Sequence, residues 1–260
     1  MSDGPDTNPG NATGNAPDAN PGNATGNAPE PDYDRLANPQ SADDVRITSW
    51  WWWIGRNILS VYFRTRYRAK KVRGKHNIPR HGGVLIVSNH MTNNDPVLVG
   101  WSAIPRRAFY MAKSELFESR IQRVIIGTLG AFPIRRGEAD RTAMRIAKGL
   151  LARGEVVIIF PEGTRSRDQR LRNPYPGAAS LGLPDDVTVI PAAIWGIHEK
   201  HGPSRVIFGP PVSKEGLEGS RGQRAGELAF RMMAAIAELL PEIGGPVQDP
   251  PTTLATTDDE

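Results

Sequence analysis

Apolar and polar positions alternate along the middle of the chain in a pattern that predicts α/β architecture. Short runs rich in β-branched residues are typical of buried strands, and they occupy 84–87, 108–111, 156–160, 187–193 and 206–208. Between them, apolar residues recur every three or four positions and predict helices over 96–101, 118–129, 141–153 and 221–240. Strands that alternate with helices predict one mixed or parallel sheet with helices on both faces.

The two ends of the chain follow neither period. Residues 8–19 recur almost unchanged at 20–31, as two copies of a twelve-residue unit of Asn, Pro, Gly and Ala. Such a unit cannot bury a core, and two copies are too few for a solenoid. We therefore expect a disordered tail over 1–44, a folded α/β domain over 71–240 and a disordered, Pro-rich acidic tail over 241–260.

The segment 45–70 has a pattern of its own. Four consecutive tryptophans, Trp50 to Trp53, lead into an apolar stretch that ends at Phe63 and is followed by a basic run. Tryptophan favours the membrane interface, and each nearby Lys or Arg adds about 1 kcal/mol of attraction to anionic headgroups. The segment is too short to span a bilayer, which predicts an interfacial helix lying in one leaflet.

Two other interpretations of this segment stay open. An apolar core helix with a solvated basic flank is the ordinary alternative, but four tryptophans cover every face of a helix, which a soluble core rarely needs. Nucleic-acid binding fits less well, because the aromatic residues precede the charges instead of interleaving with them.

Charge and composition limit the classes of partner and of chemistry that this chain can have. Outside the two tails the chain holds 31 basic and 15 acidic residues, a net charge of +16. This surplus favours an anionic partner: nucleic acid, an anionic membrane or a phosphorylated substrate. The chain has no cysteine, which excludes disulfides, thiol catalysis and cysteine-ligated metals. The first 44 residues contain no apolar run that would act as a secretory signal, so we expect a cytosolic protein.

A histidine and an aspartate follow the strand at 84–87. Asp95 is the only acidic residue between Asp44 and Glu115, a span with thirteen Lys and Arg. His90 is the natural general base because its side chain titrates near neutrality, and Asp95 has the chemistry to orient its imidazole. The alternative is that Asp95 only caps the following helix. With no cysteine and no Gly-x-Ser-x-Gly turn in the chain, such a pair would activate a hydroxyl of the substrate.

Two arginine clusters follow two further apolar runs. In the stretch 130–137, Arg135 and Arg136 follow an apolar run. Phe160-Pro-Glu-Gly-Thr-Arg-Ser166 stands at the end of the clearest strand. Backbone amides, a hydroxyl and a guanidinium at the end of a strand suit a phosphate. A single surface arginine is usually only solvated, but two clusters after different strands favour a shared anion pocket.

These motifs, taken in order, resemble the 1-acyl-glycerol-3-phosphate acyltransferase family. Its His-x4-Asp motif matches His90 and Asp95, its second motif ends in an arginine that matches Arg136, and its third is intact at 160–166. An apolar strand with proline at 189–194 matches the fourth. The resemblance covers about 50–210 and implies the glycerolipid acyltransferase fold, a single mixed sheet flanked by helices.

The resemblance also implies a reaction. His90, oriented by Asp95, would take the proton from the sn-2 hydroxyl of a lysophosphatidate, which attacks the thioester of acyl-CoA or acyl-ACP to give phosphatidic acid. The phosphate would be held by Arg136 and Arg165 with support from Lys113. Glu162, Gly163, Thr164 and Ser166 would form the acceptor pocket.

The family needs no metal and no bound cofactor, and its members are monotopic. We therefore expect a peripheral enzyme on the cytoplasmic face of the cell membrane, with an anionic membrane surface and a lysophospholipid as partners and no nucleic acid.

Two alternative functions stay open. One is an acyltransferase for another lysophospholipid or an amino-acid lipid, and the other is a non-catalytic membrane-lipid-binding protein on the same fold.

Overall fold

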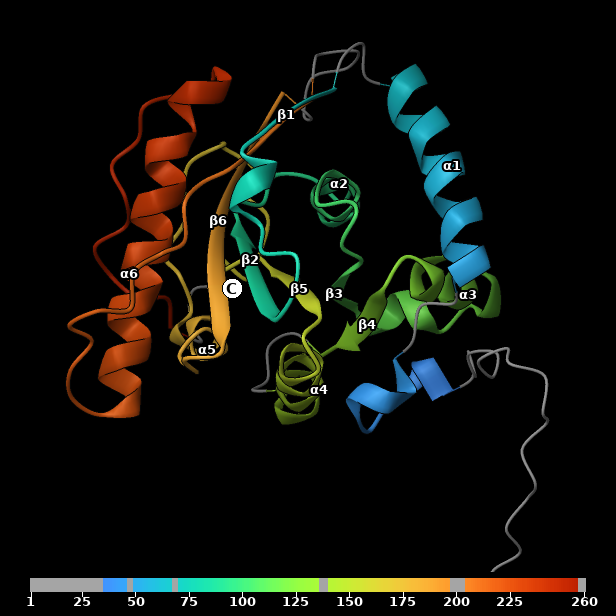
Figure 1. Cartoon of the computed structure of the whole chain (residues 1–260), viewed down its shortest axis with the longest axis horizontal. Helices are drawn as coiled ribbons and strands as arrows, with labels where there is room; N and C mark the ends of the chain where they lie inside the picture. The colour runs from blue at the N-terminus through green and yellow to red at the C-terminus, as the bar shows by residue number, and fades with distance from the viewer. Residues whose placement is uncertain (1–34, 46–48, 67–69, 136–139, 197–203, 257–260) are drawn as a thin grey trace, which may run out of the picture.

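The structure is a computed structural model that describes residues 35–45, 49–66, 70–135, 140–196 and 204–256. Within these residues seven strands form one sheet in the order β1-β7-β6-β2-β5-β3-β4 (Figure 1). Their bounds are β1 Lys70–Arg73, β2 Gly83–Ser88, β3 Ala108–Lys113, β4 Ala131–Ile134, β5 Val156–Ile159, β6 Val187–Trp195 and β7 Ser204–Phe208. Neighbouring strands are parallel except β6 and β7, which are antiparallel. The predicted single mixed sheet is therefore confirmed.

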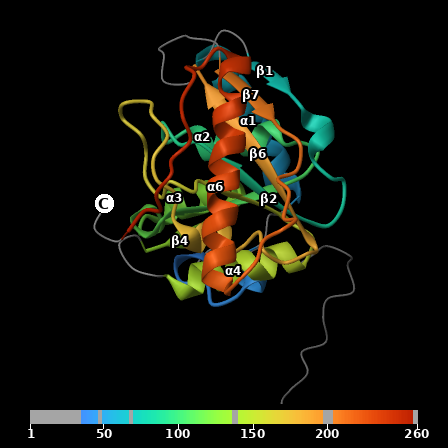
Figure 2. The ribbon, with the colours of Figure 1, turned by 90° about the vertical axis from the view of Figure 1, so that its left-hand side faces the viewer.

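The helices cover both faces of the sheet. They are α1 Ser49–Arg66, α2 Asp95–Ser102, α3 Arg120–Thr128, α4 Arg141–Ala152, α5 Pro176–Ala179 and α6 Arg221–Leu239. The β2–α2–β3 and β4–α4–β5 connections cross the sheet in opposite directions, so right-handed crossovers place α2 and α4 on opposite faces. Figures 1 and 2 show α6 against β6, on the side of the sheet opposite α2.

The centre of the core is built by β2 and β5. Every residue of both strands is buried, as expected for parallel strands that are covered on both faces. Each fully buried Val, Leu or Ile side chain contributes about 1.5–3 kcal/mol relative to an exposed one. This burial explains why an unbroken β-branched run, with no alternation of polar residues, predicts these two strands correctly.

Two strands were not predicted, and both lie at the edges of the sheet. β1 has the sequence Lys-Lys-Val-Arg, and β4 contains Pro133. A strand with a neighbour on one side only needs fewer ladder hydrogen bonds, so it tolerates charged residues and proline. The other five strands and the helices α2, α4 and α6 agree with the prediction. The helix predicted at 118–129 begins later, at Arg120, after the short 3-10 helix η4 at Ser114–Phe117.

The predicted disordered tails are wrong at their inner ends. Residues 35–45 form the 3-10 helices η1 (Arg35–Ala37) and η2 (Ala42–Asp44), with Leu36 and Val45 buried in the core. Asp43 also pairs with Arg153 of the segment that follows α4, at 2.8 Å. Because the apolar residues of this segment are isolated and not periodic, the sequence pattern does not reveal that they pack. Residues 1–34 lie outside the described residues.

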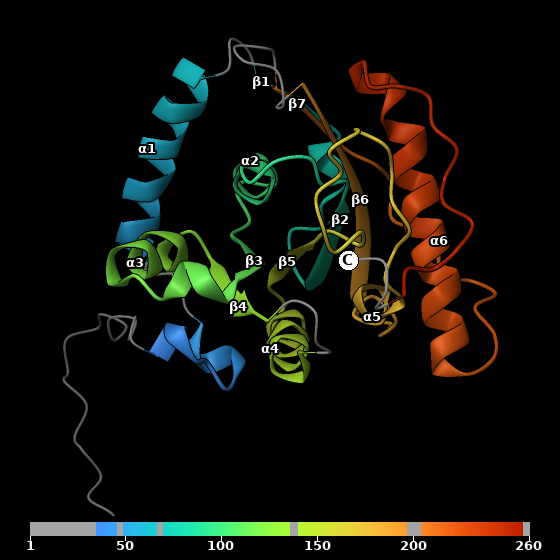
Figure 3. The ribbon, with the colours of Figure 1, turned by 180° about the vertical axis from the view of Figure 1, so that it is seen from behind.

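The chain after α6 is also ordered against the body. The 3-10 helix η5 (Pro241–Ile243) follows, and the chain then turns back beside α6 toward the loop after β5 (Figure 3). The Gln248 side chain bonds to that loop at two backbone groups, and the Ala255 amide donates to the Pro174 carbonyl at 3.0 Å. The expectation of a disordered tail over 241–260 therefore fails for 241–256, because side-chain-to-backbone bonds leave no periodic pattern.

The predicted interfacial segment forms the helix α1. It contacts α3, and Gly55 packs close to Leu129 and Thr128 at the end of that helix. The Arg107 guanidinium lies over the Trp52 ring at 5.2 Å, so this tryptophan is held against the body. None of the described helices combines the length and the apolar character needed to cross a membrane.

Candidate active site

The parallel strands bring the predicted site residues to one edge of the sheet. Val87 of β2 lies beside Ile159 of β5, and Lys113 of β3 lies beside Ile134 of β4. The residues that follow these strands therefore meet at the carboxyl edge, where α/β proteins bind ligands. His90 comes from β2 and Glu162 from β5.

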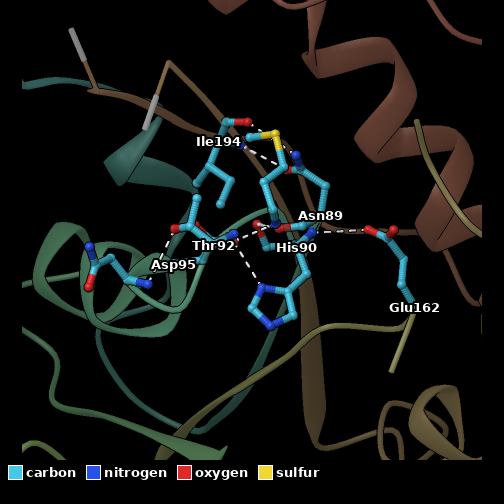
Figure 4. Close-up of polar contacts among 9 residues, drawn as sticks. Asn89, His90, Thr92, Asp95, Glu162 and Ile194 are labelled. Atoms are coloured by element: carbon cyan, nitrogen blue, oxygen red, sulfur yellow. Dashed lines mark hydrogen bonds and ion pairs between the residues drawn. The ribbon is translucent and has the colours of Figure 1, made fainter. Parts of the chain in front are cut away.

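His90 and Asp95 form a buried pair (Figure 4). His90 Nδ1 lies 2.8 Å from Asp95 Oδ2, and the two side chains are 6% and 0% exposed. Asp95 is the first residue of α2, whereas His90 lies in the loop before the helix. This bend brings together two residues that a straight helix would separate by about 140°.

Asp95 accepts hydrogen bonds from the loop that carries His90. Its Oδ2 also accepts from the backbone amides of Met91 and Thr92, at 2.6 and 2.7 Å, and its Oδ1 accepts from the Thr92 hydroxyl at 2.6 Å. Both amides precede the helix, so the interpretation of Asp95 as only a helix cap is wrong. Oδ2 already accepts from two backbone amides, which favours Nδ1 of His90 as a third donor to it and leaves Nε2 as the candidate base.

The surroundings fix the imidazole ring. The Phe160 ring stacks on it with the centroids 4.2 Å apart and the planes 24° from parallel. The Asn89 side chain bonds the Ile194 backbone twice, with its amide donating to the carbonyl at 3.1 Å and its oxygen accepting from the amide at 2.9 Å. Nε2 of His90 makes no hydrogen bond to the described residues, which leaves it available to a substrate.

Glu162 lies behind this pair and is 2% exposed. One carboxylate oxygen accepts from the His90 backbone amide at 3.0 Å, and the other accepts from the Arg172 backbone amide at 3.2 Å. Burial raises the pKa of Glu162 to about 8, although both amides and the Arg172 charge act to lower it. The carboxyl group therefore joins the loop after β5 to the loop that carries the base.

The other residues predicted for the acceptor pocket lie in the same loop. Gly163 has a φ of 67°, and a Cβ there would come within 2.7 Å of the Tyr175 ring, so glycine is required. The Ser166 amide donates to the His90 carbonyl at 2.8 Å and its hydroxyl bonds Asp168 at 2.8 Å, so Ser166 stabilises the loop. Thr164 lines a cavity together with Glu162.

The predicted phosphate ligands are placed only in part. Lys113 is exposed at the end of β3, and Arg165 is half-buried and makes no hydrogen bond or ion pair with the described residues. Both belong to segments that end at the carboxyl edge. Arg136 lies outside the described residues, and its neighbour Arg135 is exposed with its amide bonded to Asp140 at 2.9 Å. Their role in holding a phosphate stays a prediction.

The structure adds residues that the motifs do not indicate. A cavity of about 260 Å³ adjoins Glu162 and is also lined by Thr164, Arg172, Asn173, Tyr175 and Ala255. Arg172 is the last of four arginines in 165–172, a clue that the sequence offered but that solvated surface arginines would equally explain. No group of three potential metal ligands occurs among the described residues.

A candidate general base without a nucleophile of its own, at the carboxyl edge of an α/β sheet, fits the class of enzyme that transfers a group to a substrate hydroxyl. Comparison with known proteins agrees. The family model described as Acyltransferase matches residues 69–195. The 1-acyl-sn-glycerol-3-phosphate acyltransferase of Bacillus subtilis is 32% identical over 162 residues, which cover 60% of this chain and 79% of that protein. The chain therefore belongs to the 1-acyl-sn-glycerol-3-phosphate acyltransferase family, and the predicted family is confirmed.

Other relatives extend this similarity. The mouse 1-acyl-sn-glycerol-3-phosphate acyltransferase alpha is 29% identical over 160 residues, with 56% of each chain covered. The chain thus spans about half the length of this mammalian relative. A crystal structure of the 1-acyl-sn-glycerophosphate (LPA) acyltransferase PlsC from Thermotoga maritima has a TM-score of 0.54 and 23% identity, with 72% of this chain and 79% of that chain covered. This likeness confirms the predicted fold.

Proposed function

We propose that this acyltransferase moves a fatty acyl group from the thioester of acyl-CoA or acyl-ACP to the sn-2 hydroxyl of 1-acyl-glycerol-3-phosphate, giving phosphatidic acid. The observation that carries the proposal is the buried His90–Asp95 pair at 2.8 Å in a chain that has no cysteine. The acceptor is proposed from the relatives, which are 1-acyl-sn-glycerol-3-phosphate acyltransferases.

The chemistry follows from the tautomer that Asp95 imposes. Nε2 of His90 accepts the proton of the acceptor hydroxyl while the hydroxyl oxygen attacks the thioester carbonyl. The new C–O bond gives a tetrahedral intermediate, and Asp95 stabilises the imidazolium that forms beside it. The C–S bond then breaks, the acyl group stays on the acceptor, and the leaving sulfur takes the proton back from His90.

Two features support lipid substrates. An apolar pocket of about 30 Å³ lies next to α2 and is lined by Trp52, Pro96, Val97, Gly100, Trp101, Ile104, Ala108, Tyr110 and Leu129; this volume admits no more than the end of an acyl chain. Lys113 and Arg165 are available at the carboxyl edge to bind the acceptor phosphate, with Arg136 as the third cation that the family motif supplies.

Peripheral association with the cytoplasmic face of an anionic membrane is part of the proposal. Apolar side chains are exposed on α1 and on α3, two helices that contact each other. Their exposed fractions are 51% for Trp53, 64% for Ile58 and Val61, 74% for Ile121 and 55% for Ile125. Exposed apolar side chains on adjacent elements, beside a basic run, are typical of an interfacial contact.

An acceptor panel tests the proposed reaction. Purified full-length protein receives labelled acyl-CoA or acyl-ACP with lysophosphatidate, a lysophospholipid that has a larger headgroup, an amino-acid lipid, or monoacylglycerol, which has no phosphate. We expect lysophosphatidate to give the highest kcat/KM and monoacylglycerol the lowest. Preference for another acceptor would replace the proposed substrate, and transfer to none of them would contradict the enzymatic proposal.

A further inference from the structure

The cavity beside Glu162 contains a cationic group that lacks a hydrogen-bond partner. The Arg172 side chain lines this cavity and makes no hydrogen bond or ion pair to the described residues, and its Nε is buried beneath the surface of the cavity. Buried donors are nearly always paired, and an unpaired one needs an explanation such as a ligand. With about 260 Å³, the cavity is slightly below the roughly 300–1,000 Å³ typical of small-molecule sites.

The other polar groups of the cavity suit an anion. The Thr164 hydroxyl and the Asn173 amide both line it, and neither makes a side-chain hydrogen bond to the described residues. Glu162 is the acidic group in the lining, and two backbone amides already hold its oxygens. Burial raises the pKa of Glu162, which favours its uncharged form and weakens its repulsion of an anion.

The C-terminal segment completes the wall of the cavity. Ala255 lines it and is tied to the loop after β5 through Pro174. Gln248 bonds the same loop beside Arg172, accepting from the Leu171 amide at 2.8 Å and donating to the Gln169 carbonyl at 3.0 Å. The loop that carries Arg172 is therefore fixed from both sides, by Glu162 and by Gln248.

We propose that this cavity is a phosphate-binding subsite in which the Arg172 guanidinium is the principal ligand and Thr164 and Asn173 assist. Its residues differ from Lys113, Arg136 and Arg165, which the family motifs indicate as ligands of the acceptor phosphate. The phosphate belongs to the acceptor lipid, to the acyl donor or to free phosphate. The first two sources rest on the proposed function. Glu162 links the subsite to the base, because its carboxyl group bonds the backbone amides of both Arg172 and His90.

The binding test uses the full-length protein and inorganic phosphate, with hydrogen exchange of peptides from 162–175 as the readout. The variants are R172Q, R172K and the control R170Q, which removes an exposed arginine of the same loop. We expect phosphate to slow exchange in wild type and R170Q, with about a ten- to hundredfold weaker effect in R172Q. R172K should be intermediate because it keeps the charge but loses the planar guanidinium.

Kinetics with the same variants identifies the source. A higher KM for lysophosphatidate alone assigns the subsite to the acceptor, and a higher KM for acyl-CoA alone assigns it to the donor. If only the phosphate effect changes, the ligand is free phosphate.

Two outcomes would contradict the proposed subsite: no effect of phosphate on hydrogen exchange in wild type, or an equal effect in R172Q and R170Q. Lack of acyl transfer by wild type would overturn the proposed function instead, and the exchange measurement would still decide the subsite. If R172Q does not fold, R172K and wild type decide it.

Discussion

At the scale of single residues, the proposed chemistry depends on which nitrogen of His90 holds the proton. The Asp95 oxygen that faces Nδ1 also accepts two backbone amides, so the carboxylate is fixed before any substrate arrives. Because this acceptor is already in place, no group has to reorient when the imidazole takes the proton. Such preorganisation is what makes electrostatic stabilisation effective in an active site.

The first prediction concerns the charge of Asp95. Asp95→Asn keeps an oxygen for the Nδ1–H and the loop amides but removes the negative charge that stabilises the imidazolium. We expect kcat to fall about a hundredfold or more, with KM changed little, because the charge acts mainly after proton transfer. Steady-state kinetics measures this, with Asn93→Ala, an exposed residue of the same loop, as the control. An equal kcat for Asp95→Asn and wild type would contradict this role of Asp95.

The second prediction concerns Glu162, whose pKa burial raises from 4.5 to about 8. Between these values the folded protein binds the proton more tightly than the unfolded chain does. The contribution of Glu162 to stability is therefore full below about pH 4.5 and is lost as the pH rises through about 8.

Glu162→Gln cannot titrate and should not show this loss. Urea denaturation between about pH 5 and about pH 8.5 compares the two proteins, and we expect the stability of wild type relative to the variant to decline with pH. A constant difference across that range would show that the carboxyl group does not titrate there. Glu155→Gln, a partly exposed residue before β5, is the control.

The residues of the site differ in how far the sequence predicts them. His90, Asp95 and Glu162 are recognisable because their chemistry and spacing are local, and the structure places them together at the sheet edge. Arg172, Phe160 and Asn89 were not assigned to the site. Arg172 has a buried Nε without a partner, the Phe160 ring stacks on the His90 ring, and the Asn89 side chain bonds the backbone of β6. These contacts arise only when segments that are distant in the sequence meet.

At the scale of elements, periodicity identifies the buried strands and the amphipathic helices but not the packed ends of the chain. Burial on two faces forces a β-branched run in β2 and β5. The segments 35–45 and 241–256 instead attach through single apolar residues and backbone hydrogen bonds. Such contacts have no period, so composition alone suggests disorder there.

The third prediction tests the C-terminal attachment. Gln248→Ala removes two hydrogen bonds to the loop after β5, and each contributes about 1 kcal/mol. We expect the Leu171 amide to exchange faster and the unfolding free energy to fall by about 1–2 kcal/mol. Hydrogen exchange and urea denaturation provide the measurements. Thr252→Ala, at an exposed position of the same segment, should change neither. Unchanged exchange of the Leu171 amide would show that Gln248 does not hold this loop.

The fourth prediction tests the exposed face of α3. Ile121 and Ile125 are one helical turn apart and mostly exposed, which places them on a common side. If this side contacts lipid, the double substitution Ile121→Asp and Ile125→Asp should reduce flotation with anionic vesicles about tenfold or more. Gln122→Asp adds a charge at an exposed polar position of the same helix and is the control. Equal flotation of all three proteins would exclude α3 from the membrane contact.

At the scale of the whole molecule, the structure has an apolar pocket and a polar cavity. The apolar pocket lies next to α1 and α2, whereas the cavity with Arg172 lies next to α5 and the C-terminal segment. Glu162 lines the second of these, and its carboxyl group accepts from the His90 backbone amide at 3.0 Å. The Glu162 carboxyl group thus connects the proposed phosphate subsite to the residue proposed as the base.

The most direct measurement is transfer of a labelled acyl group from acyl-CoA to lysophosphatidate by wild type, His90→Ala and His81→Ala. His81 is an exposed histidine that precedes β2, so its substitution controls for the loss of an imidazole. We predict product from wild type and His81→Ala at similar rates, and at least a thousandfold less from His90→Ala, on the order of what removing a general base costs. Equal product from His90→Ala and wild type would contradict the assignment of His90 as the base.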